Sequence, residues 1–402
     1  MTLKLVNDDD WMFVPEPTFD EGQVKITDWG IDKFMGKAPP IDWLIEGVLG
    51  RGVPGLVCSL GGIGKSYLML DVCIRICAEQ GMSPNFALGG RIPKRGKAVF
   101  ITAEDSMDAV HRRLNQLVPD EKEKLKLLNH LYIIPLSNTP EGTKPLMRFD
   151  GGMYTMTDAW WNIYDQVVEM ENVALVVLDP LQALAGAGDL NADPAAAQAF
   201  WTSVTKLCSM TGCSVLATHH MRKDGSRDVD GPLAAREGIR GTTALVDSCR
   251  FVWAGWLPSA STREAVEQVV GEPLNEMSVV QGCVVKSNDI GMSPVRTYVR
   301  DTTGLLIDRT DQISDELEAR RHLSEEQVMQ TFGAVSTRWN DGDPFSHHAA
   351  AKSRYLGSWM ISHFNCTKQA AKEYISEWLA QGRLVKEPHP KIQRAQGLRF
   401  EP

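Results

Sequence analysis

The sequence lacks the features of a membrane or secreted protein. No stretch of its 402 residues approaches the roughly 18 consecutive apolar residues that a membrane helix needs. The acidic N-terminus, which includes Asp8, Asp9, Asp10 and Glu16, shows no basic-then-apolar signal pattern. None of the eight cysteines forms a Cys-x-x-Cys pair, which favours free buried thiols over zinc sites or disulfides. We therefore expect a folded cytoplasmic protein without a membrane partner.

The chain also lacks the excess of positive charge that marks many nucleic-acid binders. Its formal net charge is −9. The charge is unevenly distributed, with six acids and one base in residues 1–24 but nine bases and four acids in residues 350–402. A basic C-terminal face can meet phosphate locally, although from charge alone a solvated surface explains it equally well.

Tandem repeats are absent as well, and the chain divides by pattern into three parts. Residues 1–45 are polar and weakly periodic and predict an N-terminal arm. Residues 46–312 alternate short β-rich apolar runs with helical segments such as 66–80 and 194–211, which predicts an α/β domain with a mostly parallel sheet. Residues 315–402 predict a small helical C-terminal domain. The strand candidates are 55–59, 98–102, 131–135, 173–178, 213–218, 249–254 and 281–286.

Two segments interrupt this alternation, and the C-terminal part changes character. Residues 185–194 and 222–241 are rich in Gly, Asp and Ala, and long loops in a compact domain are usually functional or disordered. Helical spacing near 315–333, 347–363 and 368–381 predicts three further helices.

A glycine-rich loop follows the first strand and precedes the first helix. The segment SLGGIGKS at 59–66 predicts a phosphate-binding loop, in which glycines turn successive backbone N–H groups toward phosphate oxygens. Lys65 should reach the β- and γ-phosphates of ATP, and the Ser66 hydroxyl should bind Mg²⁺. The usual first glycine is replaced by Ser59. The residues expected to contact nucleotide are Ser59, Gly61, Gly62, Ile63, Gly64, Lys65, Ser66 and Tyr67.

Acids and histidines stand at the ends of three further predicted strands. Asp179 ends the apolar run 174–178 and is the candidate second ligand of Mg²⁺, although an Asp-Pro turn is the alternative. Glu104 is the candidate base that activates water, with Asp105 as the fallback, and either acid can instead cap a helix. His219 and His220 follow a neighbouring strand, where one can sense the γ-phosphate or both can be plain loop residues.

Together these segments resemble one family. In order, with plausible spacing over roughly residues 38–310, they are similar to the RepA-type hexameric replicative helicases of plasmids and phages, within the RecA-like ATPases. The segments that carry the resemblance are WLIEG at 43–47, TAED at 102–105, LDPL at 178–181, TGCS at 211–214 and RGTTALVD at 240–247.

The resemblance implies a homo-oligomeric ring, usually a hexamer, with ATP at each subunit boundary. It implies that Arg250 enters the neighbouring site as a finger, and that Lys286 is a second basic position there. It also implies that the two loops face a central channel that holds single-stranded DNA. Candidate phosphate contacts in the second loop are Arg222, Lys223 and Arg227, although three nearby aspartates weaken the electrostatic case.

The C-terminal segment resembles a winged helix. Thr367 can cap a helix in which the apolar residues share one face while Lys368 and Lys372 lie on another. Residues 383–386 and 397–400 can pair as a basic wing. Such a helix binds DNA in helix-turn-helix proteins, but a protein-binding or ring-stabilising role is nearly as well supported.

Three functions fit these motifs. The first is an ATP-driven DNA helicase or translocase that replicates a mobile element. The second is a DNA-bound ATPase that does not unwind, acting as a loader or switch, and only strand displacement separates it from the first. The third is a P-loop kinase for a small molecule, against which ring assembly and DNA-stimulated hydrolysis would count.

Overall fold

The computed structural model divides the chain into two units, with the division between Asp42 and Trp43. In the first unit, the 3-10 helices η1 (Ile26–Trp29) and η2 (Ile31–Phe34) contain no buried residue. The second unit begins with β1 (Trp43–Ile45), whose last two side chains are fully buried. The structure describes residues 26–401 except 80, 141, 187–189, 191, 223–228, 230, 242, 320–321, 365 and 391–395.

A nine-stranded sheet forms the centre of the second unit, in the order β15-β14-β13-β12-β3-β11-β10-β6-β7. The six strands from β7 to β12 are parallel, and the three beyond β12 pair antiparallel. The strands are β3 (Pro54–Ser59), β6 (Lys97–Thr102), β7 (Leu131–Pro135), β10 (Val173–Asp179), β11 (Ser214–His220), β12 (Phe251–Trp256), β13 (Val279–Ser287), β14 (Arg296–Arg300) and β15 (Leu306–Asp308).

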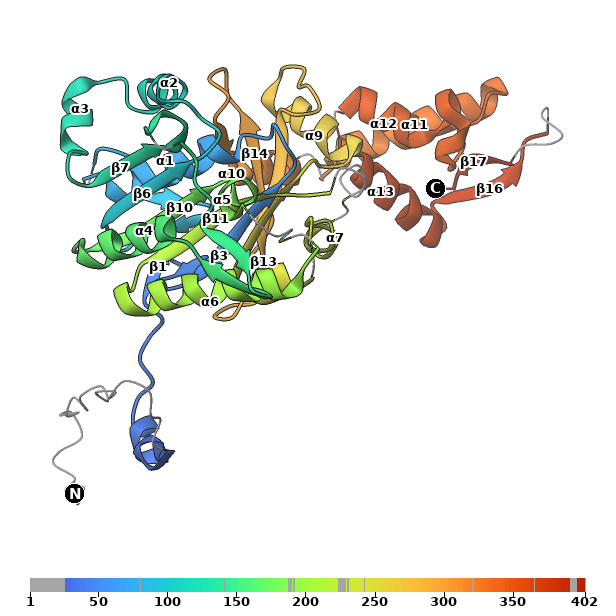
Figure 1. Ribbon diagram of the computed structural model, residues 1–402. Coiled ribbons are helices and arrows are strands. Elements are labelled where there is room, and N and C mark those ends of the chain that lie inside the picture. Colours follow the sequence, from blue (N-terminus) through green and yellow to red (C-terminus); the bar gives the residue numbers. More distant parts are fainter. Residues whose placement is uncertain are drawn as a thin grey trace, which may run out of the picture. The chain divides into compact units, whose positions relative to one another are not determined.

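Helices cover both faces of this sheet (Figure 1), which is why β10 is apolar at every position before its final aspartate. Alternate residues point to opposite faces. Val176 and Leu178 pack in a cluster with α4 and α6, whereas Leu175 and Val177 pack in a cluster with α1. The helices of this domain are α1 (Lys65–Cys77), α2 (Met107–Leu117), α3 (Glu121–Lys126), α4 (Asp158–Glu169), α5 (Leu181–Ala185), α6 (Pro194–Thr211), α7 (Pro232–Glu237), α8 (Thr243–Asp247), α9 (Ala260–Val270) and α10 (Thr310–Ala319).

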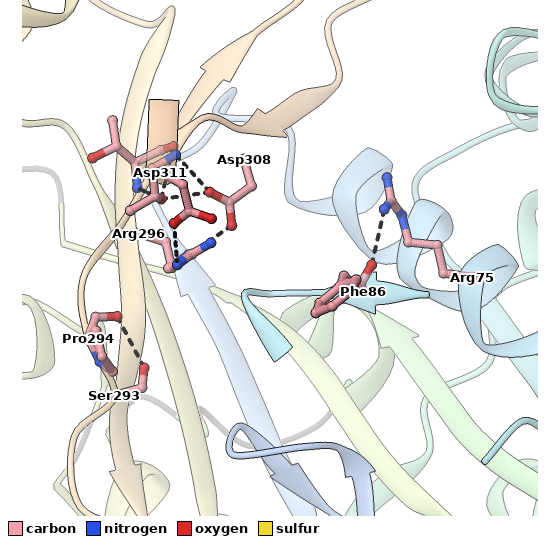
Figure 2. A network of polar contacts seen from close by, with 9 residues as sticks. Arg75, Phe86, Ser293, Pro294, Arg296, Asp308 and Asp311 are labelled. Carbon is pink, nitrogen blue, oxygen red and sulfur yellow. Dashed lines mark hydrogen bonds and ion pairs between the residues drawn. The ribbon is translucent and has the colours of Figure 1, made fainter. Parts of the chain in front are cut away.

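The domain also contains short hairpins and a 3-10 helix. The Arg75 guanidinium of α1 donates to the Phe86 carbonyl at 3.0 Å, which ties the hairpin β4–β5 to α1 (Figure 2). The remaining elements are β2 (Leu49–Gly50), which pairs with β1, β4 (Phe86–Ala87), β5 (Gly90–Arg91), η3 (Leu136–Asn138), β8 (Met147–Asp150) and β9 (Met153–Met156).

The C-terminal elements have a hydrophobic cluster of their own, which includes Phe332 and Trp378. Thr367 accepts a hydrogen bond from the Ala370 amide at 3.1 Å and caps α13, as predicted. The strands β16 and β17 pair antiparallel. These elements are α11 (Glu325–Asp341), η4 (Ala349–Arg354), α12 (Leu356–Phe364), α13 (Lys368–Ala380), β16 (Leu384–Pro388) and β17 (Gln396–Phe400).

The predicted α/β class and all seven predicted strands are confirmed, but two helix predictions need correction. The helix expected at 347–363 is the 3-10 helix η4 followed by α12. The single helix expected at 315–333 is two helices, α10 and α11. Ile313 of α10 packs with Val279 and Val299 of the sheet. The second helix starts at a capping box, in which the Ser324 side chain accepts from the Gln327 amide and the Gln327 side chain accepts from the Ser324 amide. The predicted loop 222–241 contains α7, and part of it lies outside the described residues.

The cysteine prediction is confirmed, because all eight cysteines are free and buried. Within the described part of the chain, no helix combines the length and apolarity required to span a bilayer.

Candidate functional site

The glycine-rich loop lies between β3, which ends at Ser59, and α1, which begins at Lys65. Gly62 and Gly64 have φ values of 79° and 102°, a backbone conformation that residues with a Cβ rarely adopt. Ser59 is fully buried, so a small residue fits at this position although the usual pattern has glycine. The turn thus has the backbone conformation that a phosphate cradle requires.

Lys65 is a buried cation at the centre of the loop. Its Nζ donates to the carbonyls of Ser59 and Leu60 at 3.2 and 3.0 Å, and lies 3.4 Å from Nδ1 of His220. Burial lowers the pKa of Lys65, whereas the negative charges of Asp179 and Glu104 oppose this shift. Among the described residues, no carboxylate forms an ion pair with this ammonium, so the site favours an added anion.

Ser66 and Asp179 come together as predicted for a magnesium site. Asp179 is 2% exposed and accepts a hydrogen bond from the Thr218 hydroxyl at 2.5 Å, and the Ser66 hydroxyl lies close enough to act on its pKa. Burial raises its pKa, and the two hydroxyls oppose the shift. One carboxylate and one hydroxyl fit Mg²⁺, which takes its other ligands from phosphate and water. No group of three His, Cys, Asp or Glu among the described residues could hold a metal alone.

The structure distinguishes the two candidate bases. Asp105 is half-buried and forms an ion pair with Arg113. Glu104 is exposed, and its pKa is raised by partial desolvation and by the charges of Asp179 and Asp105. A carboxylate with a raised pKa is a stronger base. Glu104 is therefore free to act on water near Asp179, whereas Asp105 is committed to Arg113.

His219 and His220 are the last two residues of β11, so they are strand residues and point to opposite faces. His220 is half-buried, and burial and the Lys65 charge lower its pKa. His219 is 1% exposed, and its Nε2 lies 2.9 Å from the Arg240 carbonyl. Burial lowers the pKa of His219 to about 4. Only His220 lies against Lys65, so of the two histidines only His220 remains a candidate sensor of the γ-phosphate.

Two other residues predicted to contact nucleotide, Tyr67 and Ile63, have side chains that already contact other parts of the protein. Tyr67 is 7% exposed and its hydroxyl donates to Gln116 of α2 at 3.0 Å. Ile63 is buried at 1% exposure within the cluster around α1. These residues can therefore meet phosphate only through backbone N–H groups, and their side chains hold the loop and α1 in place.

Arg250 and Lys286 lie at the opposite edge of the sheet from the P-loop. The Arg250 amide donates to Pro54, five residues before Ser59, which places it roughly 16 Å away along β3 at 3.3 Å per residue. Its side chain is exposed. The Lys286 ammonium donates to three backbone carbonyls at 2.7 to 2.9 Å, at and just after the end of α8. Since an ammonium has three donors, Lys286 has a structural role and none is left for catalysis.

The predicted DNA contacts are separated in the structure. Arg222 lies just after β11, where its guanidinium donates to the Gly241 carbonyl at 3.3 Å. Lys223 and Arg227 lie outside the described residues. Lys368 and Lys372 are exposed on α13, one helical turn apart.

The sequence patterns missed Arg300, which ends β14 and contacts the P-loop. Its guanidinium donates to the carbonyls of Gly62 and Ile63 at 3.0 and 2.6 Å. The contact joins residues more than 230 positions apart through an antiparallel strand that lacks a motif. A strand alternation in RTYVR at 296–300 was the only local signal available.

Comparison with known families supports the nucleotide site. The sequence model of the AAA domain family matches residues 20–226, which is 207 of 402 residues. The chain belongs to this AAA domain family. It is accordingly a P-loop ATPase with a RecA-like core. The family match includes Lys65, Glu104, Asp179 and both histidines, but it ends before Arg250 and Arg300.

Among solved structures, this AAA domain protein is similar to the flagellar accessory protein FlaH from Methanocaldococcus jannaschii. The identity is 12% and the TM-score is 0.38, over 64% of this chain and 89% of that chain. A comparison with curated proteins finds no match.

We predict that Glu104→Gln retains ATP binding but lowers the hydrolysis rate on the order of a hundredfold or more, because the amide cannot accept a proton from water. Asp105→Asn is the matched control. It should lower the melting temperature through loss of the Arg113 ion pair and leave hydrolysis largely intact. Steady-state phosphate release and nucleotide titration measure both effects. The reverse pattern would assign the base to Asp105.

We also predict a pH-dependent contribution of His219 to stability. Its pKa is about 4 when folded and about 6.5 when unfolded, so the unfolded chain binds more protons between these values. The contribution is complete above pH 6.5 and is lost as the pH falls toward 4. At pH 5 the loss is about 2 kcal/mol. His219→Gln, which can still donate to Arg240, should show a correspondingly smaller drop in unfolding free energy between pH 7.5 and 5.

Urea denaturation at the two pH values measures this difference. The exposed His111 provides a control, and His111→Gln should keep the drop of the unaltered protein. An equal drop in His219→Gln and the unaltered protein would contradict the assignment.

Proposed function

We propose that this ATPase is a RepA-like helicase or translocase that forms a ring and moves on single-stranded DNA. The observation that carries the proposal is a chain of hydrogen bonds. It runs from Lys65 through His220 to the base of the loop that follows β11.

The base of this loop is held against the end of β11. The Met221 amide donates to Ser59 at 3.0 Å, and Met221 forms an antiparallel bridge with Ile239. The Arg240 amide donates to the His220 carbonyl at 3.1 Å, while the Arg240 carbonyl accepts from Nε2 of His219 at 2.9 Å. Both ends of the loop therefore meet at the two histidines.

This arrangement supports coupling between nucleotide and loop. A change of charge at the terminal phosphate acts on Lys65, which is buried, and on the half-buried His220 beside it. A shift of His220 moves Arg240, whose amide donates to the His220 carbonyl, and also Met221, which follows it in the chain. The loop begins with Arg222 and carries Lys223 and Arg227, which are suited to backbone phosphates without sequence preference.

The placement of Arg250 supports a ring. An exposed arginine at the amino edge of the sheet cannot reach the P-loop of its own subunit, which lies at the carboxyl edge. Head-to-tail packing of identical subunits brings unlike edges together and closes into a ring when the rotation permits. Arg250 then faces the phosphates of the neighbour, where a guanidinium stabilises transition-state charge.

The C-terminal elements support a further DNA contact. Helices α11, α12 and α13 with the hairpin β16–β17 are arranged in the order of a winged helix. Lys368 and Lys372 are exposed on α13, where they can meet phosphate without disturbing the cluster around Trp378.

We predict that single-stranded DNA raises the ATP hydrolysis rate severalfold and that the protein assembles beyond a dimer with Mg-ATP. Phosphate release with and without an oligonucleotide tests the first, and light scattering tests the second. Lys65→Ala controls for contaminating ATPases. A monomer or dimer whose rate ignores DNA would overturn the proposal, and a stimulated ring that fails to open a forked duplex would be a loader or switch.

We predict that Arg250 acts across a subunit boundary. Arg250→Ala should bind nucleotide normally and lose most turnover, because its neighbour lacks the finger. Mixing it with Lys65→Ala should restore part of the rate, since some interfaces then combine an intact Lys65 with an intact Arg250. Rings that form but show no restoration at any mixing ratio would exclude the shared site.

A further inference from the structure

An arginine from the antiparallel part of the sheet donates hydrogen bonds to the backbone carbonyls of the P-loop. Arg300 ends β14, and its Nη2 donates to the carbonyls of Gly62 and Ile63 at 3.0 and 2.6 Å. Its Nε donates to the Met277 carbonyl at 3.2 Å, which fixes the orientation of the guanidinium. The same planar group thus bonds two successive peptides of the loop.

These two peptides carry the N–H groups of Ile63 and Gly64. The Gly62 carbonyl belongs to the same peptide unit as the Ile63 N–H, and the Ile63 carbonyl to that of the Gly64 N–H. In a phosphate cradle such successive N–H groups face the anion. A cation bonded to the carbonyl end of a peptide polarises the unit, and this makes its N–H a stronger donor.

The charge of Arg300 is not neutralised by an acid. Among the described residues no carboxylate forms an ion pair with it, and desolvation lowers the pKa of its guanidinium. Arg296, at the other end of the same strand, differs. It is paired with Asp308 at 2.9 Å and with Asp311 at 3.3 Å, which joins β14 to β15 and α10 (Figure 2). One end of β14 is therefore anchored, and the other brings an unpaired cation to the loop.

The neighbouring turn holds this contact in place. The Asp301 carboxylate accepts from the amides of Thr303 and Leu305 at 2.8 and 2.9 Å, and these bonds stabilise the turn after Arg300. A Cβ on Gly64 would lie 3.6 Å from the Gly304 carbonyl and 3.8 Å from the Arg300 guanidinium. The turn and the guanidinium therefore lie directly against the loop at Gly64.

We propose that Arg300 is a positioning residue of the nucleotide site, which fixes and polarises the Ile63 and Gly64 peptides so that their N–H groups bind the β-phosphate. The proposal rests on nucleotide binding at the P-loop, and it is independent of the ring and of DNA. Because ADP and ATP share the β-phosphate, the effect must be the same for both nucleotides.

The test compares Arg300→Gln and Arg300→Lys with the unaltered protein. Arg300→Gln keeps an amide that can donate to one carbonyl, but it removes the positive charge. It should lower the affinities for ADP and for ATP by a similar factor, on the order of tenfold for the loss of a charge-assisted hydrogen bond. The rate at saturating ATP should change much less than KM. Arg300→Lys keeps the charge without the fork and should recover part of the affinity. Titration with fluorescent ADP and ATP measures both.

Arg309→Ala is the matched control, because Arg309 is an exposed arginine just after β15 that bonds Gln312 instead of the loop. It should bind both nucleotides normally. Unchanged affinity in folded Arg300→Gln, even with a lower melting temperature, would overturn the proposal. So would a loss confined to ATP, which would indicate a γ-phosphate contact. Lys65→Ala distinguishes a failure of the Arg300 proposal from a failure of the nucleotide site on which it rests. If Lys65→Ala bound nucleotide as tightly as the unaltered protein, the phosphate site itself would be refuted.

Discussion

The Lys65 ammonium is a positive charge held out of water, and the rest of the site is arranged around it. Its hydrogen bonds go to the carbonyls of Ser59 and Leu60, and a buried cation without a directly bonded carboxylate is costly. An anion at the loop relieves that cost, so the lysine selects for phosphate. The charges of the nearby acids Asp179 and Glu104 oppose the lowering of the Lys65 pKa by burial. These two acids therefore belong to the same site as Lys65.

Parallel strands explain why residues so distant in sequence meet here. The strands β3, β6, β10 and β11 all end at one edge of the sheet, so the residues that follow each apolar run converge. This convergence could be predicted from sequence, because a continuous apolar run marks a strand with both faces covered, and the residue after it marks the edge. Glu104, Asp179 and His220 were found in this way. The rule depends only on local pattern and on strand direction.

Other parts could not be predicted because they depend on contacts without local pattern. Arg300 reaches the P-loop only because β14 pairs antiparallel with β13 in one register, and neither strand carries a motif. Lys286 looked catalytic by its position in the chain, but three carbonyls near the end of α8 take all its donors. The predicted helix at 315–333, by contrast, divides at Ser324, which caps α11 together with Gln327. This boundary has a local signal, the capping box SEEQ at 324–327, which helical periodicity alone overlooks.

The two edges of the sheet have different chemistry, and this difference has a consequence for the catalytic cycle. At the carboxyl edge, Lys65 and Asp179 are buried and hydrogen-bonded, so a change of phosphate charge acts on them through a low dielectric. At the amino edge, Arg250 is exposed and its charge is screened until another surface covers it. A cation in water contributes little to transition-state stabilisation, but the same cation in a closed interface contributes much more. If hydrolysis depends on Arg250, it must therefore depend on the closure of that interface, which makes assembly part of the chemistry.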